Sequence, residues 1–201
     1  MITILIVIPL INFFKFRYIN IVFITNIFNL ILALYFYFEI IFGDISISIN
    51  ITNFINILYI SSNYCFTLNI LSKNMTLLIL FISFLIQIYS LSYMNYDTHK
   101  NIFISTLNLF TFAKLLIVNS SNLLILLFGY ELVGIVSYLL ISFYYTSINA
   151  NLSALSALFI NKIGDMSLII TIVIIFYIFG NTEYETLYIF TYIINQNLLL
   201  L

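Results

Sequence analysis

Four charged side chains stand well inside long apolar stretches of this 201-residue sequence, at least four residues from either end: Lys114, Glu131, Lys162 and Asp165. A charge at the centre of a membrane helix costs about 2.5–3.5 kcal/mol on insertion scales, so each one that remains needs a partner or a water-filled cavity. Amines and carboxylates held in this way can exchange protons, because a moving neighbouring charge changes their protonation. These four residues are therefore the candidates for proton transfer or for supporting charges beside a proton path.

Glu131 is the strongest of the four candidates. It lies eight residues into its apolar stretch, or ~12 Å from the start of a helix, which is close to the middle of a ~30 Å hydrocarbon core. Gly134 and Tyr138 follow at i+3 and i+7, so a small residue and a hydroxyl share the face of the carboxylate. A purely structural carboxylate is the alternative, but acids inside membranes commonly mark ion paths.

Lys162 and Asp165 are three residues apart and share a helix face, where they can form an ion pair. Such a pair can serve proton transfer or simply fix how the helix packs, and both readings stay open. Lys114 lies nearer the end of its own apolar stretch. If neighbouring helices pack at about 8–10 Å, we expect Lys114 to lie within reach of Glu131.

The elements that must position these residues are membrane helices. Hydrophobic residues make up 64% of the sequence and charged residues 6%, too few charges to cover the surface of a soluble domain. Spanning helices need ~20 apolar residues, and six stretches approach that length. They cover roughly residues 2–16, 19–42, 75–93, 102–118, 123–145 and 152–179. The sequence predicts an all-α integral membrane protein, a single multi-pass bundle of about six transmembrane helices.

Two segments fall outside these stretches. Residues 43–69 contain strict alternation, as in Ile45-Ser46-Ile47-Ser48-Ile49, which predicts a small external loop or hairpin. Residues 181–201 are apolar but interrupted by an Asn-Gln-Asn run, so we expect an interfacial tail.

The few charged and metal-ligating residues exclude several classes of protein. A net charge of −1 leaves no basic surface for nucleic acid. Cys65 is the only cysteine and His99 the only histidine, so the chain cannot supply a cysteine-rich metal site or the several intramembrane histidines of a haem protein. The abundance of Ile, Phe, Tyr and Asn indicates an AT-rich gene, as in an organelle.

Residues 129–134 read GYELVG and residues 137–141 read SYLLI. They resemble the G-W-E-x-V-G and S-[YF]-L-L-I segments of NADH dehydrogenase subunit 5, the distal antiporter-like subunit of respiratory complex I. Residues 161–165 read NKIGD, close to N-R-I-G-D, and residues 89–94 read YSLSYM. The motifs keep the family's order and spacing over about residues 71–168.

The resemblance implies the N-terminal half-bundle of a proton-translocating subunit in the membrane arm of NADH:ubiquinone oxidoreductase. Glu131 would belong to a proton half-channel, with Lys114, Lys162 and Asp165 as path or supporting charges. The chain itself would bind no cofactor, since flavin, iron–sulfur clusters and quinone would lie on other subunits. It would be a multi-pass protein of the mitochondrial inner membrane, in contact with lipids and other membrane-arm subunits.

The sequence also departs from the family. Tyr130 replaces the usual Trp, Lys162 the usual Arg, and Lys114 the usual Met. The family continues into further helices, so this chain is either a fragment or, as we expect, one of two pieces, with the downstream half of the subunit on a separate chain. Two rival functions remain, a cation/proton antiporter subunit and a structural or assembly protein without transport residues of its own.

Overall fold

The computed structural model describes residues 7–11, 19–43, 47–57 and 60–199. Residues 7–11 form a short helical segment, and the rest of the helix predicted over 2–16 lies outside the described residues. The elements that follow are α2 (Ile19–Gly43), β1 (Ile47–Ile57), β2 (Ile60–Leu68), α3 (Ile70–Tyr93), α4 (Lys100–Val118), α5 (Leu123–Ile141), α6 (Ile148–Phe179) and α7 (Tyr184–Leu199).

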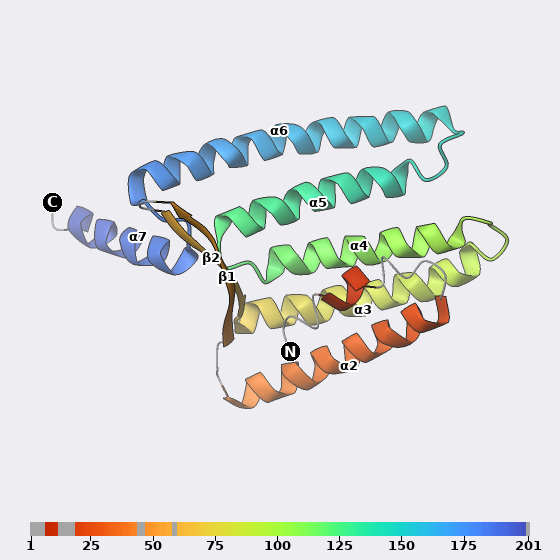
Figure 1. The fold of residues 1–201 in the computed structure, drawn as a ribbon, viewed down its shortest axis with the longest axis horizontal. Helices are drawn as coiled ribbons and strands as arrows, with labels where there is room; N and C mark the ends of the chain where they lie inside the picture. The colour runs from red at the N-terminus through yellow and green to blue at the C-terminus, as the bar shows by residue number, and fades with distance from the viewer. Residues whose placement is uncertain (1–6, 12–18, 44–46, 58–59, 200–201) are drawn as a thin grey trace.

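Helices α2 to α6 lie side by side in the order of the sequence (Figure 1), each packed against the next along the chain. Among the described residues, α3, α4, α5 and α6 are long and apolar enough to cross a membrane, and α2 contains a shorter apolar stretch, Val22–Tyr35. The predicted class, a helical membrane bundle, is confirmed. Helix α6 has 32 residues and is ~48 Å long, so it must tilt or extend beyond a ~30 Å core.

Three predicted helix ends were wrong by four or five residues. Helix α3 begins at Ile70 and not at residue 75, because the backbone N–H of Asn69 donates a 2.7 Å hydrogen bond to Ser72 Oγ and starts the helix. Helix α6 begins at Ile148 and not at residue 152, directly after Ser147. Helix α5 ends at Ile141 and not at residue 145. Hydropathy marks where a helix becomes apolar, whereas the first and last turns of a helix can also contain polar residues, as Asn149 and Asn151 do in α6.

The alternating segment forms a two-stranded antiparallel hairpin in which Ile47 pairs with Leu68 and Ile57 with Ile60, as predicted. The hairpin is anchored on the bundle at β2. Phe66 is buried in one apolar cluster with residues from four helices, and the backbone N–H of Thr67 donates a 3.1 Å hydrogen bond to the carbonyl of Asn119. The helical members of that cluster are Ala33, Leu80, Leu115, Leu116 and Ile125.

Besides its bond to the hairpin, the α4–α5 connection is hydrogen-bonded to the segment between α6 and α7. Leu123 N–H donates to the carbonyl of Thr182 and Tyr184 N–H to the carbonyl of Ser121, each at 3.2 Å. Burial raises the pKa of the Tyr184 hydroxyl, and a hydrogen bond with Ser120 partly opposes this. Residues 184–199 therefore form a helix whose first residue is hydrogen-bonded to the bundle. Figure 1 shows this helix running away from helices α2 to α6. Its predicted place at the membrane interface stays a prediction.

Candidate functional site

Glu131 lies in the middle of α5 and is half-buried. The helix ends at Ile141, which leaves ~12 Å of helix before the carboxylate and ~15 Å after it. A 19-residue helix spans ~28 Å, about the thickness of the hydrocarbon core. The structure thus places this carboxylate at the middle of its helix, and its depth in the membrane stays a prediction.

The two glycines of the same motif show which way Glu131 points. Gly129 faces α4, since a Cβ built on it would lie 2.6 Å from Ile117 Cγ1. Successive helical residues are rotated by about 100°, so Glu131 is turned about 200° from Gly129 and points away from α4. Gly134 is turned only about 60° from Glu131, and a Cβ on it would lie 3.7 Å from Asn161 of α6. The residues of α5 that line the groove against α6 are Leu126, Tyr130, Val133 and Gly134, so Glu131 lies beside that face and points away from α4.

Lys114 does not share that side. It lies on the surface of α4 that borders α3, with its ammonium 4.4 Å from the centre of the Phe110 ring. Both Lys114 and Glu131 are described, and no ion pair within 4.0 Å joins them. The structure does not bring these two charges together, because α4 turns the lysine toward α3 while α5 turns the glutamate away from α4.

The Lys162–Asp165 ion pair predicted from the spacing is present. Lys162 Nζ lies 3.8 Å from Asp165 Oδ2, and the aspartate side chain is 10% exposed whereas the lysine is 47% exposed. The two residues lie on either side of the midpoint of α6. Asp165 lines an open groove of about 580 Å³ between α5 and α6, together with Tyr130, Gly134 and Asn161.

Removing the lysine of this pair is expected to cost more stability than neutralising the aspartate. Lys162→Gln leaves a buried carboxylate without its cation, which should lower the free energy of unfolding by about 1–2 kcal/mol. Asp165→Asn should lower it less, because the lysine that remains is half-exposed. The thermal midpoint of the purified assembly measures both effects. Lys162→Arg keeps the charge and should restore the midpoint, and equal losses for the two single variants would contradict the ion-pair account.

A cluster of buried amides is a feature that sequence reasoning missed. Asn26 Nδ2 donates to Gln87 Oε1 at 2.7 Å and to Asn108 Oδ1 at 3.0 Å, and Gln87 Nε2 donates to the same Asn108 oxygen at 2.7 Å. These bonds tie α2, α3 and α4 together through side chains that are at most 9% exposed. The presence of Asn and Gln inside apolar stretches could have predicted this cluster, since polar side chains in membrane helices form hydrogen bonds between helices.

Replacing Asn108 should loosen this three-helix contact. Asn108→Leu removes the oxygen that accepts two of the three hydrogen bonds, and interhelical bonds of this kind contribute about 0.6–1.7 kcal/mol each. We expect a loss of roughly 1–2 kcal/mol, seen as a lower thermal midpoint of the assembly. Asn74→Leu is the matched control, because Asn74 is exposed on α3. An Asn108 variant as stable as the Asn74 variant would contradict a stabilising role for the cluster.

The end of the bundle opposite the hairpin is joined by a hydrogen bond between two connections. Tyr144, between α5 and α6, donates from its hydroxyl to Asp97 Oδ2 at 2.7 Å. The hydrogen bond to this carboxylate raises the pKa of Tyr144 above its usual value of 10. A raised tyrosine pKa means that the protonated hydroxyl is favoured in the folded protein, so this contribution is present at neutral pH and is lost only as the pH rises beyond 10.

The fold and the charges at mid-helix define a polytopic helical membrane protein. Two sequence profiles match it in consecutive segments: the N-terminus of NADH-ubiquinone oxidoreductase (complex I) chain 5 over residues 54–104, and the transmembrane domain of the NADH:quinone oxidoreductase/Mrp antiporter type over residues 120–201. The chain belongs to the NADH-ubiquinone oxidoreductase chain 5 family. The resemblance read from the motifs is thereby confirmed.

Relatives from fungi support this assignment. The chain is 41% identical to NADH-ubiquinone oxidoreductase chain 5 of Yarrowia lipolytica over 155 residues, 77% of its own length, and 39% identical to that of Aspergillus niger over 178 residues, or 88%. These matches span 24% and 26% of the two relatives, about a quarter of each. A chain of the membrane-bound sulfane sulfur reductase, an archaeal respiratory membrane complex, has the same fold, with a TM-score of 0.75 and 14% identity over 90% of this chain and 38% of that one.

Proposed function

We propose that this protein is a proton-translocating membrane-arm subunit of NADH:ubiquinone oxidoreductase, in the mitochondrial inner membrane. The observation that carries the proposal is Glu131, a half-buried carboxylate at the middle of α5 within the segment that matches the family. A desolvated carboxylate at this depth is costly to keep unless it has a function or a partner. Proton transfer supplies that function.

In this proposal Glu131 accepts and releases a proton as a neighbouring positive charge approaches and withdraws. The ion pair of Lys162 and Asp165 supplies supporting charges on the neighbouring helix α6, and its aspartate lines the groove between α5 and α6. Lys114 is a supporting charge on another face of the bundle. The moving cation that completes the path is therefore supplied by helices beyond this bundle. Flavin, iron–sulfur clusters and quinone would bind to other subunits.

The groove between α5 and α6 supports the existence of a protein partner in the membrane. Only 11% of the apolar window of α6 is buried, and the groove presents Tyr130, Asn161 and Asp165 along with its glycines. Polar side chains in membranes face other protein or a water-filled cavity, since exposure to lipid is costly. We propose that the downstream half of the subunit, carried by a separate chain, packs on this groove beside other membrane-arm subunits.

An inventory of the proteins that co-purify with the chain in mild detergent tests both proposals. Complex I subunits, including a chain homologous to the downstream part of chain 5, are the expected result of mass spectrometry. A second candidate, a cation/proton antiporter, is favoured by the Mrp antiporter named in one matching profile. Antiporter subunits without any NADH-oxidising partner would establish that function, and recovery of complex I without a downstream chain would contradict the divided subunit.

A further inference from the structure

Lys73 is a buried cation that the proposed proton path does not use. Its side chain is 4% exposed, and among the described residues its ammonium has neither a hydrogen-bond partner nor a carboxylate within 4.0 Å. It is the fourth residue of α3, where the positive end of the helix dipole also disfavours a cation. A buried ammonium is costly unless its N–H groups have acceptors. Lys73 therefore requires an acceptor that its present contacts do not supply.

An unused acceptor lies at the end of α4. Asn119 is 2% exposed, and its side-chain oxygen Oδ1 is buried without a hydrogen bond to any residue that the structure describes. The orientation of this amide is fixed from its other side, because Nδ2 donates to the Leu115 carbonyl at 2.9 Å. Exchanging the nitrogen and oxygen of the amide would lose that bond. Lys73 and Asn119 are thus complementary, an unused donor and an unused acceptor.

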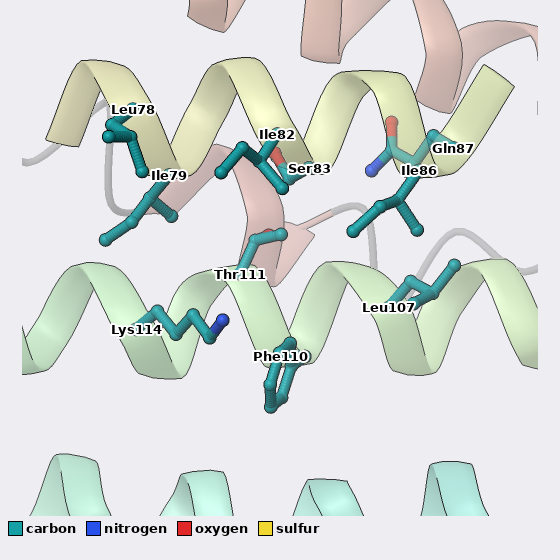
Figure 2. Close-up of a pocket in the computed structure, with 10 residues that line it drawn as sticks. All are labelled: Leu78, Ile79, Ile82, Ser83, Ile86, Gln87, Leu107, Phe110, Thr111 and Lys114. Carbon is teal, nitrogen blue, oxygen red and sulfur yellow. The ribbon is translucent and has the colours of Figure 1, made fainter. Parts of the chain in front are cut away.

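The two residues stand at the same level in neighbouring antiparallel helices. Figure 2 shows Leu78 of α3 across from Lys114 of α4. Lys73 is five residues from Leu78, and Asn119 is five residues from Lys114, both toward the end of the bundle that bears the hairpin. Equal steps of ~1.5 Å per residue bring the two positions to equal height.

Lys73 and Asn119 also lie on facing sides of their helices. The 2.7 Å hydrogen bond from Gln87 Nε2 to Asn108 Oδ1 marks the sides on which α3 and α4 face each other. Lys73 comes fourteen residues before Gln87, and Asn119 comes eleven after Asn108. At about 100° per residue, these steps turn them only about 40° and 20° from the two marker residues. Both side chains therefore start from the contact between α3 and α4.

We propose that a buried water molecule bridges Lys73 Nζ and Asn119 Oδ1. The two atoms do not bond each other directly, and a water can accept from the ammonium and donate to the amide oxygen at once. The flexible stem of the lysine allows the ammonium to move and admit it. Neighbouring hydroxyls do not compete, since Thr76 Oγ1 donates to the Lys73 carbonyl and Ser120 Oγ to the Ile117 carbonyl, each at 2.8 Å.

This water strengthens the attachment of the hairpin. The carbonyl of Asn119 already accepts a 3.1 Å hydrogen bond from the backbone N–H of Thr67 in β2. The bridge joins the same asparagine to the first turn of α3, which follows β2 directly. Both ends of the β2–α3 junction are then held by one residue at the end of α4.

Electron cryo-microscopy of the assembled protein, at a resolution that shows ordered water, tests the site directly. Density is expected within hydrogen-bond distance of both Lys73 Nζ and Asn119 Oδ1. It should be lost in Lys73→Met, which keeps a long side chain without the ammonium. A map without density there, a direct bond between the two side chains, or a carboxylate paired with Lys73 would each overturn the proposal.

A double-mutant cycle gives a second measure. Asn119→Leu also loses the bond to Leu115, but that loss is common to both backgrounds and cancels, so only the coupling with Lys73 remains. Lys73→Met and Asn119→Leu together should lower the thermal midpoint by less than the sum of their single effects. Lys100→Met is the matched control, because its ammonium donates to the Leu91 carbonyl at the other end of α4, and its loss should add to that of Asn119→Leu.

Additive losses for Lys73 and Asn119 would refute the bridge. If Lys73→Met fails to assemble, the map of the wild-type protein decides, and the absence of density between the two side chains would equally refute it.

Discussion

Replacing Glu131 with glutamine is expected to slow proton pumping by roughly tenfold or more relative to NADH oxidation, since a side chain that transfers protons contributes about 10²–10⁴-fold to the rate of its step. Glutamine fills nearly the same volume at the middle of α5 but has no titratable proton. The surrounding packing should therefore survive while the transfer step is lost. Acidification of sealed inner-membrane vesicles, measured together with NADH oxidation, gives the ratio directly.

Glu185→Gln is the matched control for this experiment. Glu185 undergoes the same chemical change but is exposed in the first turn of α7, outside the four candidate spans. Its pumping ratio should equal that of the wild type, and the amount of assembled complex should be normal in both variants. Wild-type pumping by Glu131→Gln would instead favour a structural or assembly role for this chain.

Gly129→Ala is expected to disrupt the contact between α4 and α5. An added Cβ would lie 2.6 Å from Ile117 Cγ1 and 3.2 Å from the backbone nitrogen of the same residue. The side chain can rotate but the backbone cannot, so the helices must separate. Overpacking of this kind costs about 1–3 kcal/mol. We expect a lower thermal midpoint of the assembly and, because Glu131 is two residues away, a lower pumping ratio.

Gly134→Ala distinguishes this clash from a loss of glycine in general. Its Cβ would lie 3.7 Å from Asn161, an ordinary van der Waals contact, so this variant should be as stable as the wild type. Adding Ile117→Ala to Gly129→Ala removes the closest atom and should recover part of the loss. Equal effects of the two glycine variants would show that Ile117 is not the cause.

The helices themselves were largely predictable from the sequence. Apolar stretches interrupted by polar residues mark them because hydrocarbon excludes polar backbone and charges, and the alternation at residues 45–49 marked the hairpin segment. The position of Glu131 at the middle of its helix and the ion pair of Lys162 and Asp165 followed from spacing alone. Both are properties of a single helix, fixed by its rise and turn.

What the sequence could not provide is the direction in which each helix faces. Lys114 and Glu131 were expected to meet, yet the packing of Gly129 on Ile117 turns the glutamate away from α4. The amides of Asn26, Gln87 and Asn108 meet across three helices although up to 82 positions separate them. The sequence alone determined which charges and helices the membrane must accommodate, because burial cost acts on each residue separately. Only the tertiary structure decided which charges become neighbours, because that depends on how the surfaces of different helices fit together.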